Sequence, residues 1–220
     1  MHKVTLVCSA HQECGRCNAE ELLKILRAIE PETIFEELRP GELPLYYRQG
    51  FVEARAVTDY RDYKSFQHVP VDQYDMPKDL LGEKRELDQI FLWVKQTSQE
   101  YRELMERESD SLYEYGFKYL NSPMCATMNA RMSEIEDETV NRTGDQRLIR
   151  ALKKWRHLTQ RRERDMVGNI YEYCRENVFD NGVFLVGAAH RTGIVKEIEK
   201  YAGAAADLIN WNLTFDGQIP

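Results

Sequence analysis

VTLVCSAH at residues 4–11 and VFLVGAAH at residues 183–190 are two short apolar stretches, and each ends in a histidine. Each pattern predicts a buried strand with the histidine just past its end. Ligands of open parallel sheets bind outside the carboxyl ends of the strands. We therefore expect His11 and His190 to contribute to one site that the fold assembles from opposite ends of the chain. A purely structural pair is the alternative.

The composition indicates a globular protein. The chain has 220 residues, of which 42% are hydrophobic and 30% charged, and its net charge is −7. This length and composition suit one domain with a sizeable core. An acidic chain is a poor binder of nucleic acid or anionic membranes. No apolar run approaches the ~20 residues of a membrane span, and no secretory signal is recognisable. Five cysteines, an odd number, favour reduced thiols and a cytoplasmic protein.

The first third of the chain alternates between strand and helix patterns. Asn18-Ala19-Glu20-Glu21 is a capping box that predicts the start of a helix. The expected elements after the first strand are the helix that follows this box, a short strand at 33–35, a helix at 52–63 and a strand at 67–71. Pro70 predicts that the last of these strands is an edge strand or carries a bulge. This order predicts a parallel sheet.

The middle of the chain, from 82 to 178, has helical periodicity and little strand pattern. Its clearest element is a long helix from about Asp145 to Asn177. Strand patterns return at 183–187 and 206–211, on either side of a helix at 192–202. The sequence thus predicts one α/β domain over 1–220, with a mostly parallel sheet of about five strands flanked by helices. The helical insertion at 82–178, between strands 3 and 4, would form a lid or cap.

Polar side chains follow four of the predicted strands. They are His11, Glu36 or Glu37, Asp72 and His190. Imidazole and carboxylate together suit Zn, Mn, Fe or Co better than Mg or Ca. Two histidines and one carboxylate, with one position open for water, make a hydrolytic metal site. The alternative is that each polar group simply caps a turn.

A second cluster has a strict spacing of three: Cys8, His11, Cys14 and Cys17. A thiolate metal site is disfavoured here, because such sites need a second ligand pair at a distance. A thioredoxin-type redox pair is disfavoured as well, because the helix cap follows Cys17 instead of preceding the cysteines. The charged stretch from Arg161 to Met166, in the long helix, has the simple interpretation of a solvated turn with i,i+4 ion pairs.

These residues resemble motifs of the broad TraB/Tiki group, which includes erythromycin-esterase and ChaN-like proteins. The late GxxH motif matches Gly187-Ala188-Ala189-His190, and the helix motif matches Glu163-Arg164-Asp165-Met166. The carboxylate after the second strand matches Glu37, and Asp72 matches an aspartate after the third strand. The first GxxH motif departs from the pattern, because Cys8 replaces its glycine.

The resemblance implies a metal-dependent hydrolase acting on a small-molecule or peptide substrate. His11, Glu37 and His190 would bind a divalent Mn, Co or Zn ion. Glu36 or Asp72 would accept a proton as general base, and Arg164 would stabilise the anionic intermediate. The alternatives are a non-catalytic module that binds haem or another small molecule, and a regulatory module with a degenerate site. We expect the protein to have no nucleic-acid partner and no membrane span. A homo-oligomer is compatible with the sequence.

Overall fold

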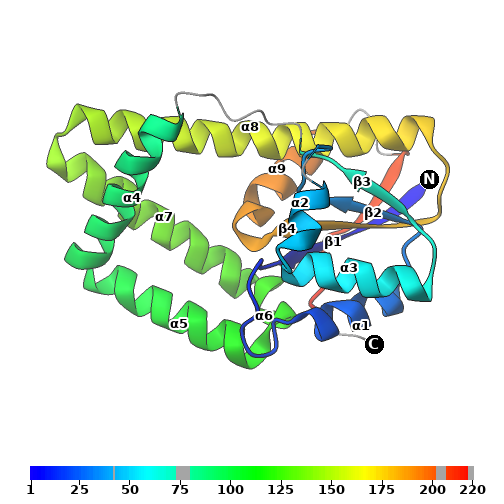
Figure 1. The fold of residues 1–220 in the computed structure, drawn as a ribbon. Helices are drawn as coiled ribbons and strands as arrows, with labels where there is room; N and C mark the ends of the chain where they lie inside the picture. Colours follow the sequence, from blue (N-terminus) through cyan, green and yellow to red (C-terminus); the bar gives the residue numbers. More distant parts are fainter. Residues whose placement is uncertain (42, 73–79, 202–206, 218–220) are drawn as a thin grey trace.

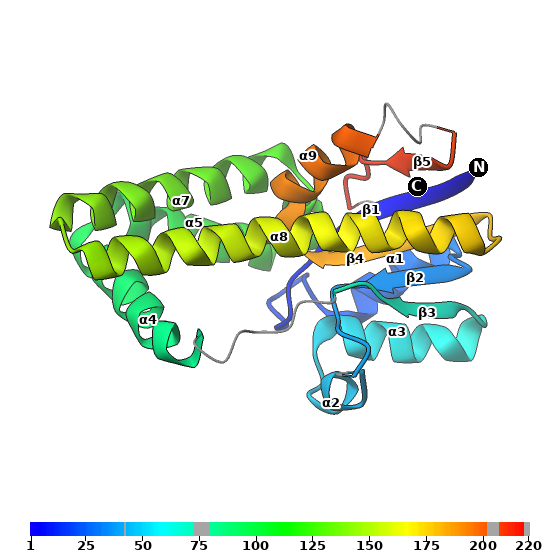
Figure 2. The ribbon, with the colours of Figure 1, turned by 90° about the horizontal axis from the view of Figure 1, so that it is seen from above.

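The chain folds into a five-stranded parallel sheet with helices on both faces, in the order β3-β2-β4-β1-β5 (Figures 1 and 2). The structure is a computed structural model that describes residues 1–220 except 42, 73–79, 202–206 and 218–220. The strands are β1 (His2–Ser9), β2 (Thr33–Glu36), β3 (Gln67–Pro70), β4 (Asn181–Gly187) and β5 (Ile209–Asn212). The predicted fold class and strand number are confirmed.

The helices of the sheet domain cover the two faces separately. They are α1 (Ala19–Ile29), α2 (Leu43–Arg48), α3 (Val52–Tyr63), α9 (Arg191–Tyr201) and the carboxyl-terminal half of α8 (Gln146–Glu176). One core joins α1 and α3 to Val7 and Leu185, and the other joins α8 and α9 to Leu6 and Val186. Alternate residues of β1 and β4 thus enter opposite cores, which explains why both strands are apolar without interruption.

Local sequence signals account for most element boundaries. The side chain of Asn18 accepts a hydrogen bond from the Glu21 backbone at the start of α1, as the capping box predicts. β3 lies at the edge of the sheet, where Pro70 costs no ladder hydrogen bond. The long helix α8 matches the expected 145–177 within one residue at each end. The last predicted strand begins at Ile209, and residue 206 lies outside the described residues.

The predicted insertion forms a helical arm, defined as α4, α5, α6, α7 and the first half of α8. Its helices are α4 (Leu80–Thr97), α5 (Gln99–Tyr115), α6 (Phe117–Leu120) and α7 (Pro123–Thr143). The arm extends beyond the carboxyl ends of the strands (Figure 1). It has a small apolar core of its own. Helix α8 has 31 residues and a length of about 46 Å, so it runs through both arm and sheet domain. No helix of the described part of the chain is long and apolar enough to cross a membrane.

A buried asparagine, Asn121, adds a polar contact between the arm and the sheet. β5 pairs only with the first half of β1, and Asn121 takes the place of a strand beside the second half. Its Oδ1 accepts from the Cys8 backbone N–H (2.8 Å), and its Nδ2 donates to the Cys8 and Phe117 carbonyls (3.1 and 2.9 Å). The side-chain amide thereby imitates a peptide group and closes an otherwise open strand edge.

Asn121→Ala is expected to lower the free energy of unfolding by about 2–3 kcal/mol, because it leaves buried backbone groups of Cys8 without partners. Urea unfolding measures this change. Asn141→Ala, at an exposed position of α7, is the control and should cost less than about 0.5 kcal/mol. Equal effects of the two substitutions would show that the hydrogen bonds between Asn121 and the Cys8 backbone do not stabilise the end of β1.

Candidate functional site

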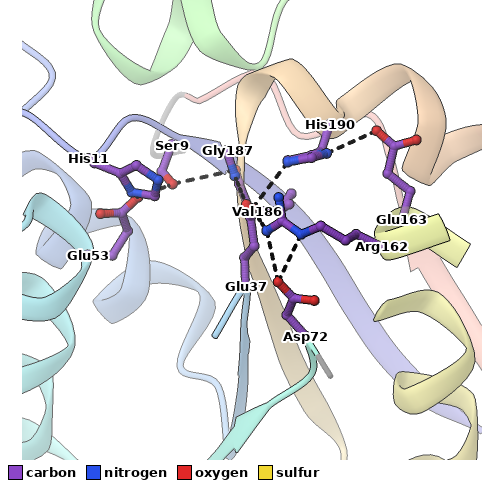
Figure 3. A network of polar contacts seen from close by, with 10 residues as sticks. All are labelled: Ser9, His11, Glu37, Glu53, Asp72, Arg162, Glu163, Val186, Gly187 and His190. Carbon is purple, nitrogen blue, oxygen red and sulfur yellow. Dashed lines mark hydrogen bonds and ion pairs between the residues drawn. The ribbon is translucent and has the colours of Figure 1, made fainter. Parts of the chain in front are cut away.

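His11 and His190 lie at the same edge of the sheet. β1 and β4 are neighbours, with Ser9 paired to Gly187 at their ends. His11 follows β1 in a loop, and His190 lies in the short helical turn η1 (Ala188–His190) that follows β4. Figure 3 shows the two imidazoles on either side of Gly187. The expectation that the fold brings both histidines to one edge agrees with this geometry.

His190 lies between two carboxylates. Its Nδ1 donates to Oε1 of Glu163 (3.0 Å), and its Nε2 lies 3.1 Å from Oε1 of Glu37 (Figure 3). The side chain is only 12% exposed. Burial alone would lower the pKa of His190, but the hydrogen bonds and negative charge of Glu163 and Glu37 outweigh it. They raise the pKa to about 9, so the imidazole is a cation at neutral pH in the metal-free protein.

Glu37 is the shared acceptor of the cluster. Its Oε1 also accepts from Nη2 of Arg162 at 2.6 Å, and its Oε2 accepts from the Gly187 backbone N–H at 3.0 Å. Burial would raise the pKa of this carboxyl group. The contacts with His190, Arg162 and Gly187 reverse the shift and lower the pKa to about 2. Glu37 is therefore ionised across the physiological range.

Arg162, and not Arg164, is the arginine of this cluster. Its Nε and Nη2 donate to Oδ2 of Asp72 at 3.0 and 2.8 Å, in addition to the bond with Glu37. Arg164 lies on another face of α8, where its side chain is 61% exposed. Its Nε lies 3.7 Å from Oδ1 of Asp165. The structure therefore does not bring Arg164 to the other expected site residues. Asp72 is at the site, with its carboxylate bound by the Arg162 guanidinium.

His11 has a carboxylate partner of its own. Nδ1 of His11 lies 3.2 Å from Oε1 of Glu53, a residue of α3 that is only 3% exposed. Glu53 also accepts from Ser9 Oγ (2.6 Å) and Tyr46 OH (3.0 Å). The hydrogen bond with Glu53 raises the pKa of His11, and the charge of Glu37 adds to this effect while that of His190 opposes it. The two histidine clusters are thus electrostatically coupled.

Glu36 points away from Glu37, as successive residues of a strand do. Its Oε2 contacts Nε2 of His68 and accepts from Tyr47 OH at 3.1 Å. Its Oε1 is buried and has no hydrogen-bond partner among the described residues. The structure therefore separates Glu36, one of the two expected general bases, from the cluster that holds His190 and Glu37.

The donor types at this edge fit a transition metal. His11, His190 and Glu37 supply two imidazoles and a carboxylate, which suit Zn, Mn, Fe or Co. Metal-bound histidines commonly direct the other ring nitrogen to a carboxylate, and here Glu53 and Glu163 occupy that place on Nδ1. Within the described ranges, no group of three or more His, Cys, Asp or Glu side chains is close enough to hold a metal ion as it stands. A metal would have to replace the proton and guanidinium that Glu37 now contacts.

Sequence reasoning missed three groups of the site: Arg162, Glu163 as a partner of His190, and Glu53. Helical spacing could have found the first two. Arg162 lies four residues before the buried Met166, and Glu163 lies four before the buried Val167, so both occupy the sheet-facing side of α8. Glu53 has no comparable signal, because its burial depends on how the start of α3 meets the end of β1.

Gly193 makes room for the Glu163–His190 contact. A Cβ at this position of α9 would overlap the Glu163 carboxylate. Gly193→Ala is therefore expected to displace Glu163, to lower the His190 pKa and to cost about 1–3 kcal/mol of stability. Histidine chemical shifts followed against pH, together with urea unfolding, measure both effects. Gly168→Ala in α8 is the control, since its Cβ would lie 3.3 Å from the Tyr201 hydroxyl and would not overlap it; a similar result for both variants would contradict the steric role.

The fold and site define an α/β protein with a His–carboxylate–Arg cluster at the carboxyl edge of a parallel sheet. Comparisons with protein-family models, with curated proteins and with solved structures found no match for the chain.

Proposed function

We propose that the protein is a metal-dependent hydrolase of a small-molecule or peptide substrate. The observation that carries the proposal is the pair of buried carboxylates, Glu53 and Glu163, on Nδ1 of the two histidines. A carboxylate on Nδ1 fixes the ring and leaves Nε2 for a metal. The resemblance to the TraB/Tiki group implies the same chemistry and the same ligands: His11, His190 and Glu37.

The bound divalent ion would supply Lewis-acid polarisation and an activated water near neutral pH. The chain's own residues provide the surroundings. Arg162 places a positive charge at the same strand ends as the proposed ligands, where it would stabilise negative charge that develops on the substrate during hydrolysis. It therefore takes the role that the sequence suggested for Arg164. Asp72 positions the Arg162 guanidinium through two hydrogen bonds to one oxygen, which makes it a positioning residue here and not the general base.

Metal content tests this proposal most directly. The protein is purified without chelator, analysed for metals, and titrated with Mn, Co and Zn by calorimetry. We expect the wild type to bind one ion, and His190→Ala and His11→Ala to lose at least ~90% of the affinity. His157→Ala is the matched control, because it removes an exposed imidazole from the arm. A wild type that is metal-free and binds none of the three ions would overturn the proposal.

Activity is measured on the metal-loaded protein with panels of peptides and esters. Arg162→Lys is expected to lower kcat more than it raises KM. Lysine keeps the positive charge but lacks the planar guanidinium that fixes its position, so substrate binding should change less than the chemical step. A Soret band on haem titration, lost in His190→Ala, would instead favour the non-catalytic ligand-binding module.

A further inference from the structure

Cys14 and Cys17 face each other in a two-residue hairpin beside the site. The backbone N–H of each donates to the carbonyl of the other at 2.9 Å, and Gly15 between them has a φ of 53°. Opposed residues of such an antiparallel pair project to the same face, with Cα atoms about 5.5 Å apart. Disulfides usually span Cα distances of about 4.4–6.8 Å. The hairpin therefore places the two Cα atoms within the range that a disulfide spans.

The two cysteines differ in access to solvent. Cys14 is partly exposed, whereas Cys17 is fully buried. Burial is the main cause that raises the pKa of Cys17 to about 12, so this group is a protonated thiol in the resting protein. The arrangement is that of an accessible thiol backed by a protected one. The other described free cysteines, Cys8, Cys125 and Cys174, are all buried.

We propose that Cys14 and Cys17 are a reversible dithiol–disulfide site, which a small disulfide oxidant such as oxidised glutathione converts. The Cys14 thiolate attacks one sulfur of the oxidant and releases one glutathione thiol. Cys17 then loses its proton and attacks the Cys14 sulfur, which releases the second glutathione thiol. The two cysteines give up two electrons, and their two protons end on the released thiols.

The position of the hairpin couples this site to His11. A backbone interaction with Ala10, the residue immediately before His11, partly offsets the rise in the pKa of the Cys17 thiol. A Cys14–Cys17 bond would draw that sulfur toward Cys14, and we expect it to weaken the interaction with Ala10. At the hairpin tip, the Arg16 backbone N–H donates to the Tyr113 carbonyl at 3.0 Å, which docks the same loop on the end of α5. We therefore expect oxidation to loosen the segment that carries His11, whether or not a metal binds there.

Peptide mapping tests the disulfide. The full-length protein is incubated with oxidised glutathione, alkylated in denaturant and digested with trypsin. Cleavage after Arg16 separates residues 4–16 from residues 17–24, so a Cys14–Cys17 bond appears as a link between these two peptides. We expect the link in the wild type and in Cys8→Ser, its loss in Cys14→Ser, and its loss on reduction.

Fragmentation of the linked wild-type peptides identifies the bonded residue even if Cys8→Ser does not fold. Separately alkylated peptides, or a glutathione adduct that persists on Cys14 while Cys17 is alkylated, would overturn the proposal. Coupling to His11 has its own readout. We expect hydrogen exchange at the Ala10 amide to be faster in the oxidised protein, with no change at amides in the centre of β4; equal rates at Ala10 in both forms would refute the coupling.

Discussion

Arg162→Ala is expected to lower the free energy of unfolding by about 3–5 kcal/mol, because it leaves Glu37 and Asp72 as buried charges without their guanidinium. Arg164→Ala is the matched control. Arg164 lies two residues further along the same helix and takes part only in an exposed ion pair with Asp165. Its replacement should lower the free energy of unfolding by less than about 1 kcal/mol. Urea unfolding of the metal-free protein measures both values.

A double-mutant cycle separates the pair energy from the loss of packing. The double variant Arg162→Ala, Asp72→Asn should lose less free energy of unfolding than the two single variants together. The reason is that Asp72→Asn removes the negative charge that the Arg162 guanidinium balances. Additive effects, or equal effects of Arg162→Ala and Arg164→Ala, would show that the guanidinium does not hold the two carboxylates together.

The stability of the metal-free protein is expected to fall as the pH rises from about 6.5 to about 9. The pKa of His190 is raised from 6.5 to about 9, so the folded state binds its proton more tightly than the unfolded state does. The resulting stabilisation is fully present below pH 6.5 and is lost as the pH rises through 9. A shift of this size corresponds to about 3 kcal/mol.

Glu37 acts at the acidic end in the opposite direction. Its pKa is lowered from 4.5 to about 2, so its contribution is present above pH 4.5 and is lost as the pH falls through 2. The pair is therefore most stabilising between about pH 4.5 and 6.5. Urea unfolding across this range, with chelator present, is compared with His190→Gln, which cannot titrate. The difference between the two curves should shrink toward pH 9; a difference independent of pH would contradict a buried imidazolium.

The positions of the strands along the chain were predictable, because apolar runs and their flanking caps are local signals. The runs at 4–7 and 183–186 predicted β1 and β4, and strand-end geometry then placed His11 and His190 at one edge. The site within that edge was less predictable. The helix motif pointed to Arg164, but α8 turns by about 200° over two residues, so Arg162 faces the carboxylates instead.

Partners supplied by tertiary docking left no pattern in the sequence. Glu53 lies in the first turn of α3, among ordinary helix residues. It becomes a site residue only because the start of α3 meets the end of β1, where Ser9 Oγ donates to Glu53. Helix α2 with Tyr46, which donates to Glu53, was not predicted as a helix at all. Its six residues are too few to show helical periodicity.

The place of β4 in the sheet has a consequence for synthesis of the chain. β4 lies between β1 and β2, so these two early strands share no ladder until residues 181–187 have been made. During elongation β1 and β2 each have unpaired backbone groups on the side where β4 will later lie, and their apolar side chains are only partly buried. The arm can fold first around its own core. We therefore expect ribosome-bound fragments that stop before residue 181 to contain a folded arm and an unassembled sheet, with high affinity for chaperones.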